Sequence, residues 1–297
     1  MTLRLWAGDA EAVIDPAMGA GVVSLTWAGQ AILSTGQGRT GGPFAQGMNL
    51  LVPFSNRISG PFPFGGARHT VPVDPAIDPF AVHGDGYRIP WRPDEITSDS
   101  AALMVSAGEG PFRYDARITY RLSADRLEAN ILMTNRADIS LPHGGGFHPW
   151  FPRSAATRVQ FAASGHWPED ARHLPATTAP VPAPPDWQFD PAAPLPARFV
   201  NTGFAGWDGV AHIHQPGHRV AIQAPRMTTL LVYSPGPDAP YVCLEPVSHP
   251  VDAHNLPGQP GLVPLAPGRS LTLSLRLIWG PPDRDPTTRD RSRKEVP

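Results

Sequence analysis

The sequence predicts an all-β protein built as a large antiparallel β-sandwich. Short apolar runs recur roughly every ten residues, separated by turn signals drawn from 38 Pro and 29 Gly, and long helical periodicity is absent. The last run, Ser270–Trp279, alternates strictly and places Leu271, Leu273, Leu275 and Leu277 on one face. Such period-two alternation is typical of a strand with one buried face.

The other strands are predicted in chain order from the same signals. Two hairpins are indicated, one around Ala28-Gly29 and one around the polar turn at 123–126, and a four-strand meander follows later in the chain. The predicted strands are Thr2–Trp6, Glu11–Ile14, Gly21–Trp27, Gln30–Leu33, Tyr114–Leu122 and Leu127–Thr134 and, in the meander, Val210–Ile213, Arg219–Ala224, Thr229–Tyr233 and Tyr241–Glu245.

Two stretches are expected to lack regular structure. Ala171–Pro196 is rich in Pro and Ala, which predicts a long extended loop over the surface. Pro281–Pro297 is charged and almost without apolar residues, which predicts a disordered tail. Because the strand-like segments on both sides of the loop look alike, we expect a single domain over residues 1–280.

Composition and charge exclude several classes of function. A net charge of −2 gives no electrostatic basis for binding nucleic acid or an anionic membrane. The only lysine, Lys294, lies in the tail, so the body of the chain offers no Schiff-base, pyridoxal-phosphate or phosphate-loop lysine. A single cysteine, Cys243, excludes an internal disulfide and a multi-cysteine metal centre. Without a signal-like N-terminus or a long apolar run, a soluble cytoplasmic protein is expected.

A candidate general base ends the apolar strand Tyr241–Glu245. A carboxylate in such a position loses hydration, and its pKa rises toward neutrality, which suits proton abstraction. The same stretch is also compatible with a Glu at a strand end that points into water. The stretch alone does not separate the two interpretations, so its neighbours in the fold must decide.

Two polar stretches early in the chain are candidates for binding. An apolar run ends in Asn56-Arg57, and the Arg fork suits sugar hydroxyls or carboxylates, although a surface Arg paired with an Asp would give the same pattern. His83 precedes Gly84, which permits a close backbone approach to a ligand, although a turn histidine is the more common reason for such a sequence.

Two later stretches complete the set of candidates. Three glycines at 144–146 predict an unusual loop that presents His148, flanked by aromatic residues that include Trp150. An aromatic residue beside an acid, Trp207-Asp208, is a common way to hold a sugar, since the ring stacks on C–H faces and the carboxylate accepts hydroxyl protons. A tight turn with a hydrophobic anchor is the alternative for this last stretch.

Taken together, the chain resembles the aldose 1-epimerase (galactose mutarotase) family. The motifs occur in the family's order over about residues 5–280, nearly the whole chain. They are Pro-Phe-Ser-Asn-Arg-Ile at 53–58, His83-Gly84, Thr119–Leu122 with Thr134-Asn135, Leu141-Pro142 running into Gly146–Phe151, Trp207–Gly209, Leu244–Pro246 with Asp252-Ala253, and Leu265–Gly268.

The resemblance implies a sugar site across one concave face of the sandwich, where α and β anomers of a hexose interconvert without metal or cofactor. Glu245 matches the family's general base and His148 its general acid, and Arg57, His83 and Asp208 match its sugar-binding positions. We expect Asn56 and Trp150 to bind the substrate as well. Trp150 is a departure, because the family's His-Pro motif usually carries Tyr there.

Mutarotation requires residues of these types. A base takes the C1 hydroxyl proton while an acid protonates the ring oxygen, the C1–C2 bond rotates in the open chain, and the same groups then act in reverse. We expect the acid and the base on opposite sides of the sugar, and no cofactor, because each group is restored in every cycle. The expected partner is a small hexose, and the sequence does not separate a monomer from a homodimer.

Other functions remain to be compared with this one. A metal hydrolase would use the pair His212 and His214, but no third ligand of fixed spacing accompanies it. A serine hydrolase lacks its Gly-x-Ser-x-Gly elbow. A non-catalytic sugar-binding protein on the same fold, and a hexose-6-phosphate mutarotase, stay open. The phosphate of the latter would need a basic cluster, for which Arg88, Arg92 and Arg153 are the candidates.

Overall fold

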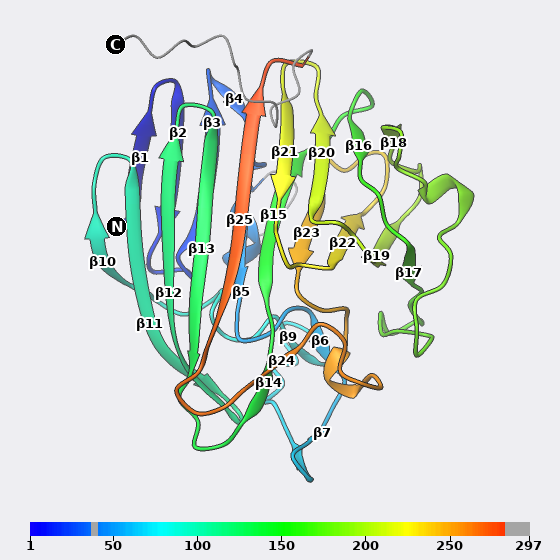
Figure 1. Ribbon diagram of the computed structural model, residues 1–297. Helices are drawn as coiled ribbons and strands as arrows, with labels where there is room; N and C mark the ends of the chain where they lie inside the picture. The colour runs from blue at the N-terminus through cyan, green and yellow to red at the C-terminus, as the bar shows by residue number, and fades with distance from the viewer. Residues whose placement is uncertain (37–40, 283–297) are drawn as a thin grey trace, which may run out of the picture.

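The computed structural model describes residues 1–36 and 41–282, and it consists of two large antiparallel sheets packed face to face (Figure 1). The predicted all-β sandwich is therefore confirmed. Most of the tail predicted to be disordered, residues 283–297, lies outside the described residues.

The first sheet has ten strands and carries the site described below. Its hydrogen-bonded order is β1 (Leu3–Ala7), β2 (Ala10–Asp15), β3 (Gly21–Trp27), β5 (Met48–Leu51), β15 (Gly146–Pro152), β23 (Tyr241–Val247), β22 (Thr229–Ser234), β19 (Val200–Ala205) and β17 (Gly165–Trp167), with β4 (Gln30–Ala31) paired to β3.

The second sheet has nine strands and lies against one face of the first. Its order is β10 (Arg92–Ile96), β11 (Ser100–Glu109), β12 (Phe112–Ser123), β13 (Arg126–Asn135), β25 (Ser270–Gly280), β21 (Arg219–Gln223), β20 (Val210–His214), β16 (Arg158–Gln160) and β18 (Ala193–Pro194). Alternate residues of β25, among them Leu273, Leu275 and Leu277, enter the core between the sheets, as the period-two pattern predicts.

Short two-stranded ribbons gather at one end of the sandwich (Figure 1). Three two-stranded ribbons pair β6 (Arg57–Ile58) with β9 (Ala81–Val82), β7 (Phe62–Phe64) with β8 (Ala67–His69), and β14 (Leu141–His143) with β24 (Val263–Leu265). The 3₁₀ helices are η1 (Pro43–Ala45), η2 (Pro185–Trp187) and η3 (Ala253–Asn255). Within residues 1–36 and 41–282, no helix has the length and apolar character needed to cross a membrane.

The predicted four-strand meander is wrong. β20 and β21 pair with each other in the nine-stranded sheet, whereas β22 and β23 pair in the ten-stranded sheet. The chain changes sheets in the short connection after β21, where Pro225 precedes Arg226 in a left-handed conformation (φ 68°). Strand periodicity predicts which face is buried, but it does not specify which strand is the partner.

The Pro-rich stretch also differs from the prediction of a loop that only covers the surface. Phe189 and Leu195 are buried in the main core, and Phe189 packs against Phe161 and Phe204 with ring centroids 5.0 and 5.9 Å apart. The stretch thus contributes side chains that close the core beside β16 and β19.

The glycines at 144–146 allow close packing of β15 against its neighbours. A Cβ on Gly144 would lie 2.2 Å from His249 Cδ2, one on Gly145 2.2 Å from the Leu51 carbonyl oxygen, and one on Gly146 2.3 Å from the Pro246 carbonyl oxygen. These distances are far inside van der Waals contact. The run therefore brings the backbone that carries His148 against the neighbouring chain.

We predict that Gly145→Ala lowers the free energy of unfolding by roughly 1–3 kcal/mol more than Gly236→Ala, since overpacking a closed site costs that much. The two glycines share nearly the same φ (145° and 147°), but a Cβ on Gly236 meets nothing within 4 Å. Urea unfolding of both variants measures the difference. Equal losses would mean that backbone strain alone, and not the close approach to Leu51, requires Gly145.

Candidate active site

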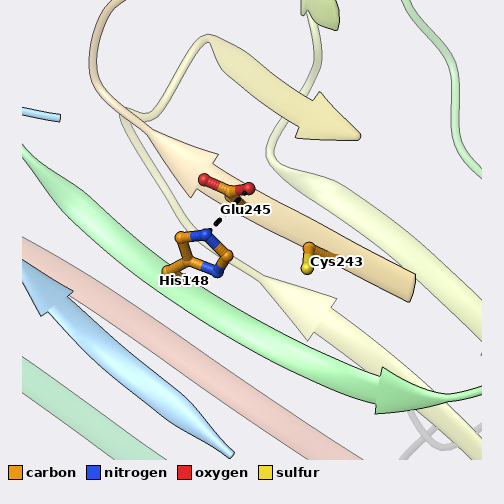
Figure 2. Close-up of side chains that lie close together, drawn as sticks. All are labelled: His148, Cys243 and Glu245. Atoms are coloured by element: carbon orange, nitrogen blue, oxygen red, sulfur yellow. Dashed lines mark ion pairs between the residues drawn. The ribbon is translucent and has the colours of Figure 1, made fainter. Parts of the chain in front are cut away.

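The site is built around the pairing of β15 with β23. Gly146 pairs with Val247 and Trp150 with Cys243, and the same register places His148 opposite Glu245. His148 Nε2 lies 3.3 Å from Glu245 Oε1, and the two side chains are 7% and 5% exposed (Figure 2). Pro149 and Pro246 lie on these facing stretches and have no N–H to donate, which interrupts the backbone ladder between the two flanking pairs.

Side-chain alternation puts the pair on the face turned away from the second sheet. Phe147, Phe151, Val242 and Leu244 point into the core, so the intervening residues of both strands point to the opposite face. Glu245 lies inside β23, which continues to Val247, and not at the strand end that the sequence predicts. The interpretation of Glu245 as an exposed strand-end residue is therefore wrong.

Burial dominates the electrostatics of Glu245. It raises the pKa of the carboxyl group from 4.5 to about 8, and the positive charge of Arg57 opposes part of this rise. A carboxyl group with a pKa near neutrality can both accept and return a proton at physiological pH. The site thus holds a titratable acid–base pair in contact, shielded from bulk water.

Aromatic rings enclose His148 on one side. Trp150 stacks on its ring with centroids 4.6 Å apart and an interplanar angle of 17°, and Phe44 of η1 lies 6.1 Å from it. Trp150 Nε1 donates to Asn49 Oδ1 at 3.3 Å, so the indole N–H that replaces the expected Tyr hydroxyl has a protein acceptor. The ring keeps its stacking role over His148.

Arg57 comes to the site from the ribbon of β6 and β9. Its Nε and Nη2 atoms donate to both oxygens of Asp78 at 2.7–3.2 Å, and its carbonyl oxygen accepts from the Asp252 backbone N–H at 2.9 Å. Arg57 is therefore paired with an Asp, but both side chains are mostly buried (19% and 11% exposed), and the Arg57 charge affects the pKa values of Glu245 and His83. It belongs to the site and is not a surface residue.

Asn56 and His83 hold each other in place beside Arg57. The Asn56 backbone N–H donates to His83 Nδ1 at 3.0 Å, and the His83 backbone N–H donates to the Asn56 carbonyl oxygen at 3.0 Å. Burial, with the charges of His148 and Arg57, holds the pKa of His83 well below its usual value. A neutral His83 whose Nδ1 accepts a hydrogen bond carries its proton on Nε2.

The glycine after His83 permits a close backbone approach, as the sequence predicts, but in the structure this approach is to the neighbouring chain and not to a ligand. Gly84 has φ 68°, and a Cβ there would lie 2.2 Å from the Val52 carbonyl oxygen. This close approach brings the His83 ring to 5.5 Å from the ring of His148, edge to face. The structure thus brings Asn56, Arg57 and His83 together with the central pair.

Asp208 lies apart from this group. It is exposed in the turn between β19 and β20, where its Oδ1 accepts from the Val210 N–H at 3.0 Å, while Trp207 beside it is buried in the core. This geometry matches a tight turn with a hydrophobic anchor. None of the contacts of the described residues links Asp208 to His148 or Glu245, and we do not propose a sugar-binding role for it.

Several residues at the site escaped the sequence prediction. Phe44 lies near His83, Tyr87, His148 and Trp150, with ring centroids 5.3–6.4 Å away. Tyr233 and Asn201 continue across the sheet from Cys243, since Cys243 pairs with Tyr233 and Tyr233 with Asn201. No local pattern marks these residues, because strand pairing places Tyr233 and Asn201 there and the 3₁₀ helix η1 brings Phe44.

One group of metal-ligating side chains stands out in the described part of the chain. His148, Cys243 and Glu245 each offer one ligand atom, and these atoms all lie within 4.8 Å of one another. Over residues 1–36 and 41–282, no such group of three includes His212 and His214, whose ring centroids are 6.3 Å apart on β20. The structure thus offers no support for the metal hydrolase built on that pair.

Sequence comparison with known proteins indicates the same family that the fold and the motifs suggest. The family model for aldose 1-epimerase matches residues 1–277. The uncharacterised protein YphB of Escherichia coli K12 is 36% identical over 241 residues, which cover 77% of this chain and 83% of YphB.

Two solved structures illustrate the structural similarity. An aldose 1-epimerase candidate from E. coli K12 has a TM-score of 0.89 at 31% identity, covering 95% of this chain and 99% of the other. A galactose mutarotase-like protein from Clostridium acetobutylicum has a TM-score of 0.80 at 21% identity, with 94% and 95% covered, and shares the fold. With its two-sheet architecture and a family match over nearly the whole length, the chain belongs to the aldose 1-epimerase family.

Proposed function

We propose that this protein interconverts the α and β anomers of a free hexose, with Glu245 as the general base and His148 as the general acid. The observation that carries the proposal is the contact of 3.3 Å between His148 Nε2 and Glu245 Oε1 in a buried site. A sugar-binding protein without catalytic activity has no use for a desolvated carboxyl group whose pKa is about 8.

Two adjacent groups suffice for the reaction. The C1 hydroxyl and the ring oxygen are bonded to the same carbon, so side chains in contact can reach both. Glu245 takes the hydroxyl proton, His148 gives a proton to the ring oxygen, and the C1–O5 bond breaks to leave an aldehyde. After rotation about C1–C2 the ring closes, His148 regains the proton from the O5 hydroxyl, and Glu245 returns its proton to O1.

The expectation of acid and base on opposite sides of the sugar is therefore corrected. A separation of 3.3 Å between Nε2 and Oε1 leaves no room for a sugar ring between the two groups. Their common position follows from the register of β15 and β23, which places both side chains on one face of the sheet. The sugar must instead lie over that face.

The surrounding residues supply the means to hold the sugar. His83 Nε2–H and the Arg57 guanidinium are donors near the pair, and the enclosing rings of Trp150 and Phe44 offer apolar faces for sugar C–H groups. Asn56 Oδ1 accepts from the Arg57 backbone N–H at 2.9 Å, which positions Arg57. We assign these groups to substrate binding and Asp78 to the orientation of the Arg57 fork.

The arrangement of charges favours a neutral sugar over a phosphorylated one. Arg88 is paired with Glu109 at 3.0 Å and with Asp74 at 3.6 Å. Arg92 is exposed on β10, the edge strand of the other sheet. Arg153 donates to the Ser234 hydroxyl and to the Pro196 carbonyl oxygen. The three arginines are thus dispersed and do not form one phosphate-binding cluster.

A second carboxylate near the site also favours a neutral sugar over a phosphorylated one. Glu169 accepts from Asn201 Nδ2 at 3.0 Å, and Asn201 lies on the row of residues that crosses the sheet from Trp150 and Cys243. Burial raises the pKa of Glu169, while His173 and Arg57 lower it, so Glu169 and Arg57 share one electrostatic environment. In its ionised form, this carboxylate would repel an anionic substrate.

We predict that Glu245→Gln and His148→Asn each lower kcat/KM for glucose or galactose by about 10²- to 10⁴-fold, the usual contribution of a general base or acid. Both amides keep the approximate shape of the side chain but cannot exchange the proton. Polarimetry or exchange NMR measures the rate, and sugar binding by NMR titration should change little. Asp208→Asn is the matched control and should keep the wild-type rate. Full activity in either site variant would disprove the assigned pair.

The pH profile provides an independent prediction. The base must be ionised, and burial raises the pKa of Glu245 to about 8. In metal-free buffer kcat/KM should therefore rise with pH, by about tenfold per unit below the pKa of Glu245, and fall again at the pH where His148 loses the proton that it gives to the ring oxygen. The spontaneous rate is subtracted at each pH. A profile that is already flat from pH 5 to 7 would show that the base has an ordinary carboxyl pKa and is not a desolvated Glu245.

Substrate choice is the third test of the proposal. Glucose and galactose should be accelerated more strongly than glucose 6-phosphate, because the arginines are dispersed and Glu169 opposes an anion. Rates for the three sugars at equal concentration, compared with the uncatalysed rates, measure the preference. Acceleration of the 6-phosphate alone would identify the protein as a hexose-6-phosphate mutarotase.

A further inference from the structure

We propose that His148, Cys243 and Glu245 bind one thiophilic divalent cation, Zn²⁺ above all, and that this ion reversibly inhibits the enzyme. The three ligand atoms, one nitrogen, one sulfur and one oxygen, all lie within 4.8 Å of one another, and the three residues are buried (Figure 2). The binding of the ion does not depend on the proposed mutarotase activity. Only the inhibition rests on that function.

The fold brings the three ligands together on a rigid support. Cys243 and Glu245 are two residues apart on β23, so both point to the same face of the sheet, and His148 faces them from β15. Both strands are interior to the ten-stranded sheet, with neighbours on each side. Little conformational freedom therefore remains to be lost when an ion binds.

The distances fit a tetrahedral ion. Zinc bonds of about 2.0–2.3 Å to N, O and S place neighbouring ligand atoms roughly 3.3–3.7 Å apart. His148 Nε2 and Glu245 Oε1 already have this separation, at 3.3 Å. A movement of about 1 Å, which rotation of the Cys243 side chain can supply, would bring Sγ to the same range. Three protein ligands would leave the fourth position for water or a sugar oxygen, as is usual in zinc sites with an exchangeable ligand.

Charge and ligand softness set the selectivity. Thiolate and carboxylate together neutralise a divalent ion, which makes its burial tolerable. The proton of the Cys243 thiol passes to solvent as the Zn–S bond forms, and so does the proton of the Glu245 carboxyl group wherever that group is still protonated. Zn²⁺ and Co²⁺ accept such a mixed ligand set, whereas Mg²⁺ and Ca²⁺ require six or more oxygen ligands in most sites. The pair His212 and His214 on β20 offers only two nitrogens and provides an internal comparison.

The bound ion would occupy the atoms that carry out catalysis. With Oε1 of Glu245 and the ring nitrogen of His148 coordinated, neither group can exchange a proton with the sugar. Cys243 has no role in the proton transfers proposed above, so its contribution is specific to the ion. Removing Cys243 should therefore reduce the sensitivity to Zn²⁺ separately from any effect on the metal-free rate.

The test uses the full chain freed of metal, titrated with Zn²⁺ by calorimetry and with Co²⁺ by absorption spectroscopy. We expect one ion per chain and a near-ultraviolet band from thiolate-to-Co²⁺ charge transfer. Cys243→Ala should abolish the band and weaken Zn²⁺ binding by more than about tenfold, since even second-shell substitutions cost that much. His212→Ala should change neither the Co²⁺ band nor the affinity for Zn²⁺. For each variant, the mutarotation rate with Zn²⁺ is compared with the rate of the same variant without metal. A chelator should restore the metal-free rate.

The possible outcomes separate the two proposals. Zn²⁺ binding at one per chain with the thiolate band, in a protein that accelerates no hexose, would support the cation site and reject the proposed function. Hexose activity that Zn²⁺ leaves unchanged would reject the inhibition. Absence of stoichiometric binding, or equal affinity in a folded Cys243→Ala variant, would reject the site itself. Circular dichroism establishes that the variant is folded.

Discussion

The contact between His148 and Glu245 is the interaction on which the rest of the site depends. Each side chain is almost fully buried, and an ionisable pair in that position is costly unless the surrounding strands hold it in a favourable geometry. The register of β15 and β23 provides that geometry, and the prolines beside both residues open the backbone ladder between them. The burial that raises the pKa of Glu245 and the closeness of both side chains to Cys243 follow from this pairing of strands.

Segments from distant parts of the chain complete the site around this pair. The ribbon of β6 and β9 brings Arg57 and His83, η1 brings Phe44, and the loop after β23 brings Asp252. Each segment is short, so packing and hydrogen bonds to its neighbours must hold it. The Asp252 carboxylate accepts from the Ser59 N–H and hydroxyl at 2.9 and 2.6 Å, which ties the loop to the chain that carries Arg57. A substrate site of this kind is preorganised by contacts that the substrate itself never makes.

Much of the fold could be predicted because strand signals are local. The alternating leucines of β25 and the turns of the early hairpins specify buried faces without reference to any partner. The meander prediction failed because the four strands β20–β23 look alike in sequence although they belong to two sheets. Asp208 shows that a short motif, like a strand pattern, does not specify its tertiary environment. An aromatic residue followed by an acid fits a sugar contact and a tight turn equally well until the exposure of the acid is known.

The sequence by itself determined the class of fold and the family to which the chain belongs, and it singled out the two residues proposed as the acid–base pair. It could do so because the order of the motifs and the period-two alternation can be read along the chain. The tertiary structure decided how those residues meet. It placed Glu245 inside a central strand, set His148 beside it on the same face, and brought Cys243 within reach of both. The physical reason is that strand register depends on packing between segments about a hundred residues apart, and no local pattern encodes that offset.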